Sequence, residues 1–203
     1  MSTIPASAKR HALGMPAGSV RTILALLVVL LVCSIILLPS SKELLPPYLI
    51  YLMFLIVGHF FAALGHAQAE HSRPLYMPRG LVQLIIIAAL GATIAWKIYH
   101  DPENLAHKWA ASVEAMKEQW FMPILLLGGF FVGVLVRMVV GRDNPPVMVQ
   151  DFEAWVALIA VVALFISGII HVIIEGIGGR PAPMPTWEGF VAAVIAFYFG
   201  ARS

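Results

Sequence analysis

The sequence predicts an all-α integral membrane protein, a polytopic bundle of about six transmembrane helices. Of its 203 residues, 60% are hydrophobic and 12% are charged, whereas a typical soluble domain has roughly 45–50% apolar and 25% charged residues. Its mean hydropathy is +0.88. The apolar residues also gather in runs close to the roughly 20 residues that a helix needs to cross a bilayer. A soluble core of this size could not bury so many apolar side chains.

Six apolar runs are the predicted spans, at about 22–38, 48–64, 81–99, 121–140, 154–174 and 187–200. We therefore expect an N-terminal segment over 1–21 and a single transmembrane domain over 22–203, with no soluble domain large enough for an enzyme active site. The last run is the weakest, because its 14 residues reach only about 21 Å at 1.5 Å per residue. We expect either a thin span or a re-entrant segment there.

The first apolar run follows three basic residues, as the apolar region of a signal peptide does; they are Lys9, Arg10 and Arg21. The run is longer than the roughly 7–15 residues of such a region, and no small-x-small cleavage site follows it, so we interpret it as an uncleaved span. With the N-terminus inside, the inner loops carry eight Lys and Arg residues and the outer loops carry five. Because basic residues favour the cytoplasmic side, we predict both termini in the cytoplasm and the protein in the cell (inner) membrane.

A short sequence motif occurs twice. Residues 13–23 read LGMPAGSVRTI and residues 75–85 read LYMPRGLVQLI, with six of eleven positions identical at a shift of 62. Pro16 and Pro78 are expected in the first helical turn, where a missing N–H costs nothing, and Gly18 and Gly80 are expected to allow close backbone approach. One interpretation is an internal repeat, a duplicated two-helix hairpin with the last two spans as a diverged third copy. The other is coincidental helix-start chemistry.

An amphipathic helix is predicted at about 102–120, in the connection between the third and fourth spans. Asp101, Pro102 and Glu103 form a good helix start, with a capping side chain, a proline and an acid in the first turn. Apolar residues then recur at helical spacing, while Lys108, Glu114, Lys117 and Glu118 fall elsewhere; the apolar set is Leu105, Trp109, Val113, Met116 and Trp120. We expect this helix to lie in the outer interface with Trp109 and Trp120 as anchors, and a partner-docking surface is the alternative.

Ionisable residues at membrane depth are functional candidates because they are costly there. His59, within the second span, is the deepest of them. It could bind the metal of a haem or a chlorophyll, or relay a proton; the alternative is a neutral imidazole bonded to a neighbouring helix. His171 with Glu175, and the stripe of His59, His66 and Glu70 that is followed by His71, are weaker metal candidates, so we predict no metal site.

Three further residues are candidates for lipid or subunit contacts. Arg137 lies near the inner end of the fourth span, where it is expected to reach the headgroups or to bind an anionic lipid. Gly129 and Gly133 form a GxxxG in the same span, and the pairs Gly58–Ala62 and Gly91–Ala95 repeat this small-xxx-small spacing. Such pairs let helices approach closely in lipid, either within one chain or between subunits.

Several function classes find no support in the sequence. The net charge of +2 comes from scattered residues, so nothing indicates nucleic-acid binding. The only cysteine, Cys33, excludes an intrachain disulfide and a multi-cysteine metal site. The glycines at 176, 178 and 179 lack the strand and the Lys-Ser or Lys-Thr of a phosphate loop, and the chain contains no HExxH and no GxSxG.

The sequence therefore favours a protein that is not an enzyme. The leading hypothesis is a non-catalytic accessory or scaffold subunit that packs in a larger membrane complex, such as a respiratory or photosynthetic one, with the bilayer and other membrane subunits or itself as partners. The first alternative is a small transporter or channel, although few polar residues lie in the spans. The second is a haem- or chlorophyll-binding membrane protein that uses His59.

Overall fold

The computed structural model describes residues 15, 16, 18–37, 45–62, 80–140, 147–176 and 185–201. Within these residues the regular structure is entirely helical. The elements are α1 (Ser19–Leu37), α2 (Pro47–Ala62), α3 (Leu81–His100), α4 (Pro102–Glu118), α5 (Met122–Val140), α6 (Val147–Gly176) and α7 (Pro185–Ala201).

Four of these helices are long and apolar enough to cross a membrane: α1, α3, the Met122–Val139 part of α5 and the Met148–Ile170 part of α6. The all-α class is thereby confirmed for the described residues, and the four long apolar helices are consistent with a helical membrane bundle. The second and sixth predicted spans also form helices, α2 and α7, but these have only 16 and 17 residues. They reach about 24 and 26 Å, short of the roughly 30 Å hydrocarbon core, so six full spans stay a prediction.

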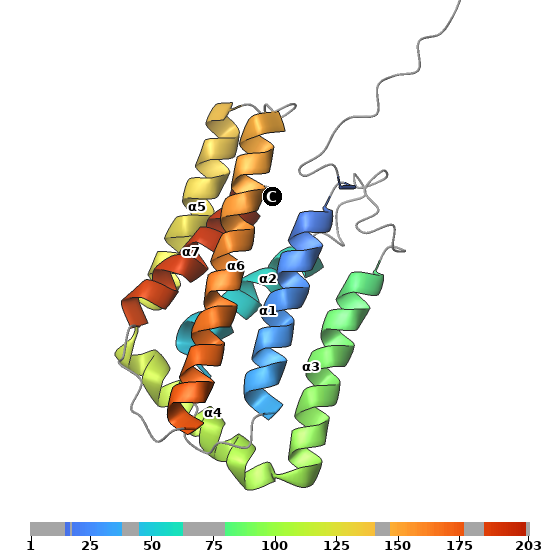
Figure 1. The fold of residues 1–203 in the computed structure, drawn as a ribbon, viewed down its shortest axis with the longest axis vertical. Helices are drawn as coiled ribbons and strands as arrows, with labels where there is room; N and C mark the ends of the chain where they lie inside the picture. Colours follow the sequence, from blue (N-terminus) through green and yellow to red (C-terminus); the bar gives the residue numbers. More distant parts are fainter. Residues whose placement is uncertain are drawn as a thin grey trace, which may run out of the picture.

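The helices alternate in direction. In Figure 1, α1, α3 and α6 run from the upper to the lower end, whereas α2, α5 and α7 run the other way and α4 crosses the lower end. The first turn of α1 and the last turn of α7 lie at the same end, because Arg21 and Phe199 both contact His59. The same arrangement is needed for two termini on one side of a membrane. That this side is the cytoplasm stays a prediction.

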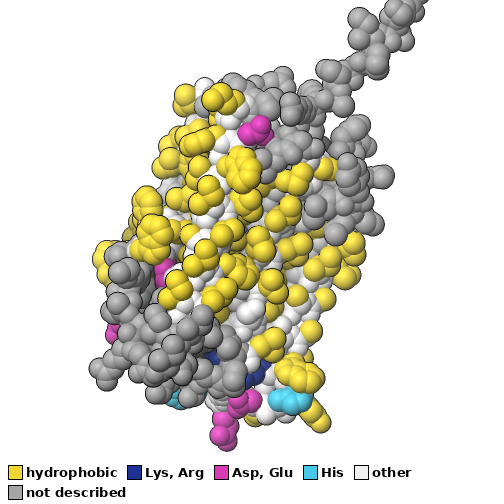
Figure 2. All heavy atoms as spheres, in the orientation of Figure 1, with side chains coloured by type: hydrophobic (Ala, Val, Ile, Leu, Met, Phe, Trp, Pro, Cys, Tyr) yellow, Lys and Arg dark blue, Asp and Glu magenta, His cyan; other side chains and the backbone are white. Residues whose placement is uncertain are grey.

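One face of the bundle is mostly apolar. Figure 2 shows hydrophobic side chains over most of the face formed by α5, α6, α1 and α3, with acidic, basic and histidine side chains gathered mainly near the lower end, where α4 lies. The helix α1 is the most buried of the four long ones, with Leu24 and Ala25 completely inaccessible. An apolar exterior around an apolar interior is expected where lipid tails surround the helices.

The two motif copies begin their helices with a left-handed glycine. Gly18 has φ 84° and Gly80 has φ 80°, a conformation that L side chains avoid. The amide of Ser19 bonds to the carbonyl of Pro16 at 3.0 Å, so Pro16 lies in a turn before α1. The prediction that it occupies the first helical turn was therefore wrong. A Cβ on Gly80 would meet nothing within 4 Å, so Gly80 serves the turn and not a close approach.

Pro78 lies outside the described residues, and the duplication itself stays a prediction. The carbonyl groups of the two glycines accept equivalent hydrogen bonds, from the backbone amide of Thr22 to Gly18 and from that of Leu84 to Gly80.

Two helix boundaries show what hydropathy can and cannot define. The start of α4 is as predicted, because Pro102 is its first residue and the Asp101 carboxylate accepts the amide of Asn104. In contrast, α6 begins at Val147, seven residues before the predicted start at 154. Its first two turns contain Asp151 and Glu153, which are compatible with a helix but too polar to count as part of an apolar run.

Candidate functional site

His59, the candidate expected deepest in the membrane, is hydrogen-bonded to a residue of α1. It lies in the last turn of α2 and is half-buried, and its Nε2 lies 3.1 Å from Nη1 of Arg21. A guanidinium has only donors, so Nε2 is the acceptor and the imidazole is neutral, with its proton on Nδ1. The ring also packs edge-on against Phe199 of α7, with centroids 5.4 Å apart.

A second side chain bonds to the same end of α2. Nε2 of Gln83 donates to the carbonyl of Phe60 at 3.5 Å, and this carbonyl belongs to the last turn of α2, where no intrahelical donor is available. Gln83 follows Arg21 by 62 residues, which is the shift between the two motif copies. Equivalent positions of the two copies therefore secure adjacent residues of one helix end. We call Arg21, His59, Gln83 and Phe199 the His59 cluster.

This geometry bears on metal binding. Nε2 of His59 already faces Arg21, so a haem or chlorophyll metal on this nitrogen would have to displace the guanidinium. Within the described residues, no group of three or more His, Cys, Asp and Glu side chains lies close enough to hold a metal ion. His171 and Glu175 fall in α6, but their side chains lie outside the described part, as do His66, Glu70 and His71 entirely.

A buried carboxyl group near the start of α7 was missed in the sequence. The Glu188 side chain accepts a hydrogen bond from the Ser167 hydroxyl of α6 and another from the Tyr48 hydroxyl of α2, and Glu188 is only 7% exposed. A buried carboxyl group is costly unless hydrogen bonds satisfy it, and here two helices supply donors. We call Tyr48, Ser167 and Glu188 the Glu188 cluster. Its sequence signal was weak, because Glu188 follows Trp187 at a span end and resembles an interfacial residue.

The two clusters lie at opposite ends of α2. Tyr48 and His59 are separated by eleven residues, or about 16 Å of helix. Leu49, Leu52 and Ile56 lie between them and are almost completely buried. The interior along this part of α2 is therefore apolar, and the polar side chains at each end connect helices across the bundle.

The buried face of α4 differs from the prediction. Lys108, expected on the polar face, is 1% exposed, and its Nζ donates to the carbonyl of Ile35 at 3.2 Å. Ser112 donates to the carbonyl of Lys108 and accepts the amide of Leu45, just before α2. Lys108 can be buried here because the carbonyls in the last turn of α1 lack intrahelical donors and because a cation is favourable at a helix C-terminus.

The glycines of α5 pack inside the chain. A Cβ on Gly129 would overlap the carbonyl oxygen of Ala193, and a Cβ on Gly133 would overlap that of Phe197 and lie 2.7 Å from the amide of Ala201. From the other side, a Cβ on Gly200 would lie 2.8 Å from the carbonyl carbon of Phe130. Gly129, Gly133 and Gly200 thus form a parallel contact between α5 and α7, which we call the glycine seam.

The remaining predicted residues lie where a lipid contact is available. Arg137 lies in the last turn of α5 and is half-buried. Trp109, in the middle of α4, and Trp120, two residues after its end, are 55% and 69% exposed. The contact of Arg137 with lipid headgroups and the role of the two tryptophans as interfacial anchors stay predictions.

Comparison with known proteins adds no relative. No protein-family model matches this chain, and no curated protein or solved structure is significantly similar to it. Its function has to be argued from the geometry alone.

Proposed function

We propose that this chain is a non-catalytic structural subunit that packs in a larger membrane complex, such as a respiratory or photosynthetic one. One observation carries the proposal: α3 presents an exposed strip of small residues. Ala88, Gly91, Ala92 and Ala95 are all exposed, and their spacing places them on one face of the helix.

The helix α3 lies at the edge of the bundle, where it packs mainly against α1 and α4 (Figure 1). A Cβ on Gly91 would meet nothing within 4 Å, whereas the same spacing in α5 is filled by the backbone of α7. Small residues at this spacing let two helices approach closely in lipid, where van der Waals packing and not hydrophobicity drives association. The strip therefore suits a transmembrane helix of another subunit.

The polar clusters also support a structural role. Arg21, Glu188 and Lys108 each bond to a helix other than their own, so these costly groups stabilise the arrangement of the helices. A transporter would need a polar path for its solute, and the apolar stretch of α2 between the two clusters does not favour one. The pigment-binding alternative is tested directly, because a haem or chlorophyll on His59 would give the purified protein visible absorption.

The main test is purification of the protein from its native membranes in a mild detergent, followed by mass spectrometry. We expect at least one different membrane protein to co-purify at stoichiometric amounts. A chain that purifies alone, or only with copies of itself, would overturn the proposal.

Two glycine variants test the strip on α3. We expect Gly91→Leu to release the partner, because the larger side chain keeps the two helices apart. Gly128→Leu is the matched control, since Gly128 is also an exposed glycine within an apolar helix and has nothing within 4 Å of its Cβ position. Equal retention of the partner in both variants would remove α3 as the docking face.

A further inference from the structure

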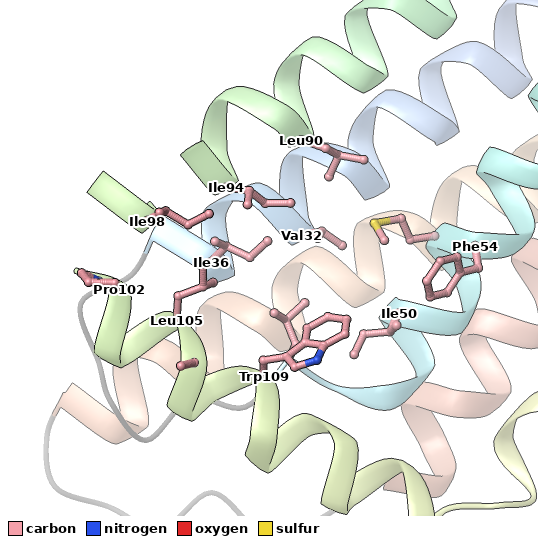
Figure 3. Close-up of a pocket in the computed structure, with 13 residues that line it drawn as sticks. Val32, Ile36, Ile50, Phe54, Leu90, Ile94, Ile98, Pro102, Leu105 and Trp109 are labelled. Carbon is pink, nitrogen blue, oxygen red and sulfur yellow. The ribbon is translucent and has the colours of Figure 1, made fainter. Parts of the chain in front are cut away.

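We propose that the groove between α1, α2 and α3, closed at one end by α4, binds one acyl chain of a membrane phospholipid. Thirteen residues line this groove, all with apolar side chains, and it encloses about 500 Å³ (Figure 3). The volume falls within the roughly 300–1,000 Å³ that is usual for ligand sites. The inference depends on the membrane location of the bundle and not on the proposed subunit role.

The groove has a buried back and an exposed front. Val32 and Ile36 of α1 form the back and are 1% and 6% exposed, whereas Phe54 of α2 and Ile94 of α3, at the front, are 60% and 41% exposed. Figure 3 shows the α1, α2 and α3 side chains converging on one space, with Trp109 of α4 beside it. The groove therefore opens sideways between α2 and α3, toward the medium around the bundle.

The shape of the groove suits a hydrocarbon chain. Its α3 wall consists of Leu90, Ile94 and Ile98, one helical turn apart, so it extends over about 12 Å along the helix. An elongated groove parallel to the spans has the direction of lipid tails in a bilayer. A water-filled groove is unfavourable because the only polar side-chain group among the lining residues is the indole N–H of Trp109, and an empty one would forfeit dispersion contacts.

The end of the groove suits the polar part of a lipid. Ala106 and Trp109 of α4 close it there, and tryptophan favours the level of the headgroups. The neighbouring charges include the ion pair of Lys97 and Asp101, whose atoms lie 3.2 Å apart, and the ammonium group of Lys108, which is 1% exposed and donates to the carbonyl of Ile35. Because the pair is internally neutralised and Lys108 is buried against α1, the structure selects the chain and not a particular headgroup charge.

For the test, the full chain is incorporated into phospholipid nanodiscs and then extracted and washed in mild detergent. Native mass spectrometry then counts the phospholipid molecules that each chain retains. We expect one retained phospholipid per wild-type chain. In Ala106→Phe, whose ring would enter the groove from α4, the amount of retained phospholipid should fall by about tenfold or more. Ala110→Phe, one turn along the same exposed helix and outside the lining, should retain the lipid. Leu90→Trp fills the groove from α3 and should reproduce the loss.

The location is checked with a phospholipid that carries a photoreactive group on its acyl chain. Crosslinks on Phe54, Leu90 or Trp109 that disappear in Ala106→Phe support the proposal. Equal lipid retention in the two alanine variants overturns it, and so does retention of an isoprenoid compound or of a second protein in place of phospholipid. These outcomes leave the proposed subunit role unaffected, because that role is tested by Gly91→Leu on another face of α3.

Discussion

Two regions of the bundle hold their helices together in opposite ways. In the glycine seam, α5 and α7 are in direct backbone contact, because the glycines have no side chain to keep the two helices apart. At the other side, α4 is secured by side chains, since Lys108 and Ser112 bond to the end of α1 and to the amide before α2. We call Lys97, Asp101, Lys108 and Ser112 the α4 corner. Packing in the seam leaves no space, whereas the corner lies beside the apolar groove.

The comparison shows that one sequence pattern has two uses. Gly129 and Gly133 lie against α7, whereas Gly91 and Ala95 have the same spacing and remain exposed. The spacing makes close approach possible. Which helix becomes the partner depends on which one the connectivity of the chain places beside it.

The largest effect is expected in the glycine seam. Gly133→Ala should destabilise the protein by about 3 kcal/mol or more, at the upper end of what overpacking costs, because the new methyl group meets backbone atoms of α7 that cannot move independently. Gly128→Ala, on the exposed side of the same helix, should stabilise it by about 0.5–1 kcal/mol through helix propensity. Unfolding in mixed detergent micelles measures both, and effects of the same sign would contradict the seam.

An intermediate effect is expected in the α4 corner. Lys108→Met keeps the length of the side chain but leaves the carbonyl of Ile35 without this donor, which should cost about 1–3 kcal/mol. The same change at Lys117 of α4, whose ion pair with Glu114 is largely exposed, should cost at most about 1 kcal/mol. Amide hydrogen exchange in the last turn of α1 should accelerate only in Lys108→Met. Equal acceleration in both variants would show that Lys108 does not secure α1.

The smallest effect concerns pH. The hydrogen bond from the Asn104 side chain, aided by Lys97, holds the pKa of Asp101 below its usual value. A carboxyl group whose pKa is lower in the folded state stabilises that state above its unfolded pKa of about 3.9. This contribution is lost as the pH falls through the folded pKa.

The thermal midpoint of the wild type should therefore decrease as the pH falls below about 4, and less so in Asp101→Asn, which keeps a capping side chain. Glu114→Gln, the same kind of change at an exposed position of α4, serves as the control. If Asp101→Asn and the wild type lose the same stability in acid, the Asp101 interactions do not contribute.

The polar clusters were only partly predictable. His59 stands out because it interrupts an apolar run, but its partner Arg21 belongs to the basic flank of the first span and was counted there as a topology signal. Glu188 was overlooked because it lies at a span end, and Lys108 was assigned to the wrong face of α4. In each case the donor or acceptor that satisfies the costly group lies on another helix.

The sequence by itself determined the all-α class, the apolar stretches that form the long helices and the start of α4, because apolar length, helical periodicity and capping are local properties. Only the tertiary structure decided that Gly129 and Gly133 pack within the chain, that Lys108 is buried and that Glu188 joins three helices. The reason is physical: in lipid, apolar surface is satisfied almost anywhere, so the arrangement depends on close backbone contacts and on pairing of polar groups. Both depend on residues that are distant in sequence.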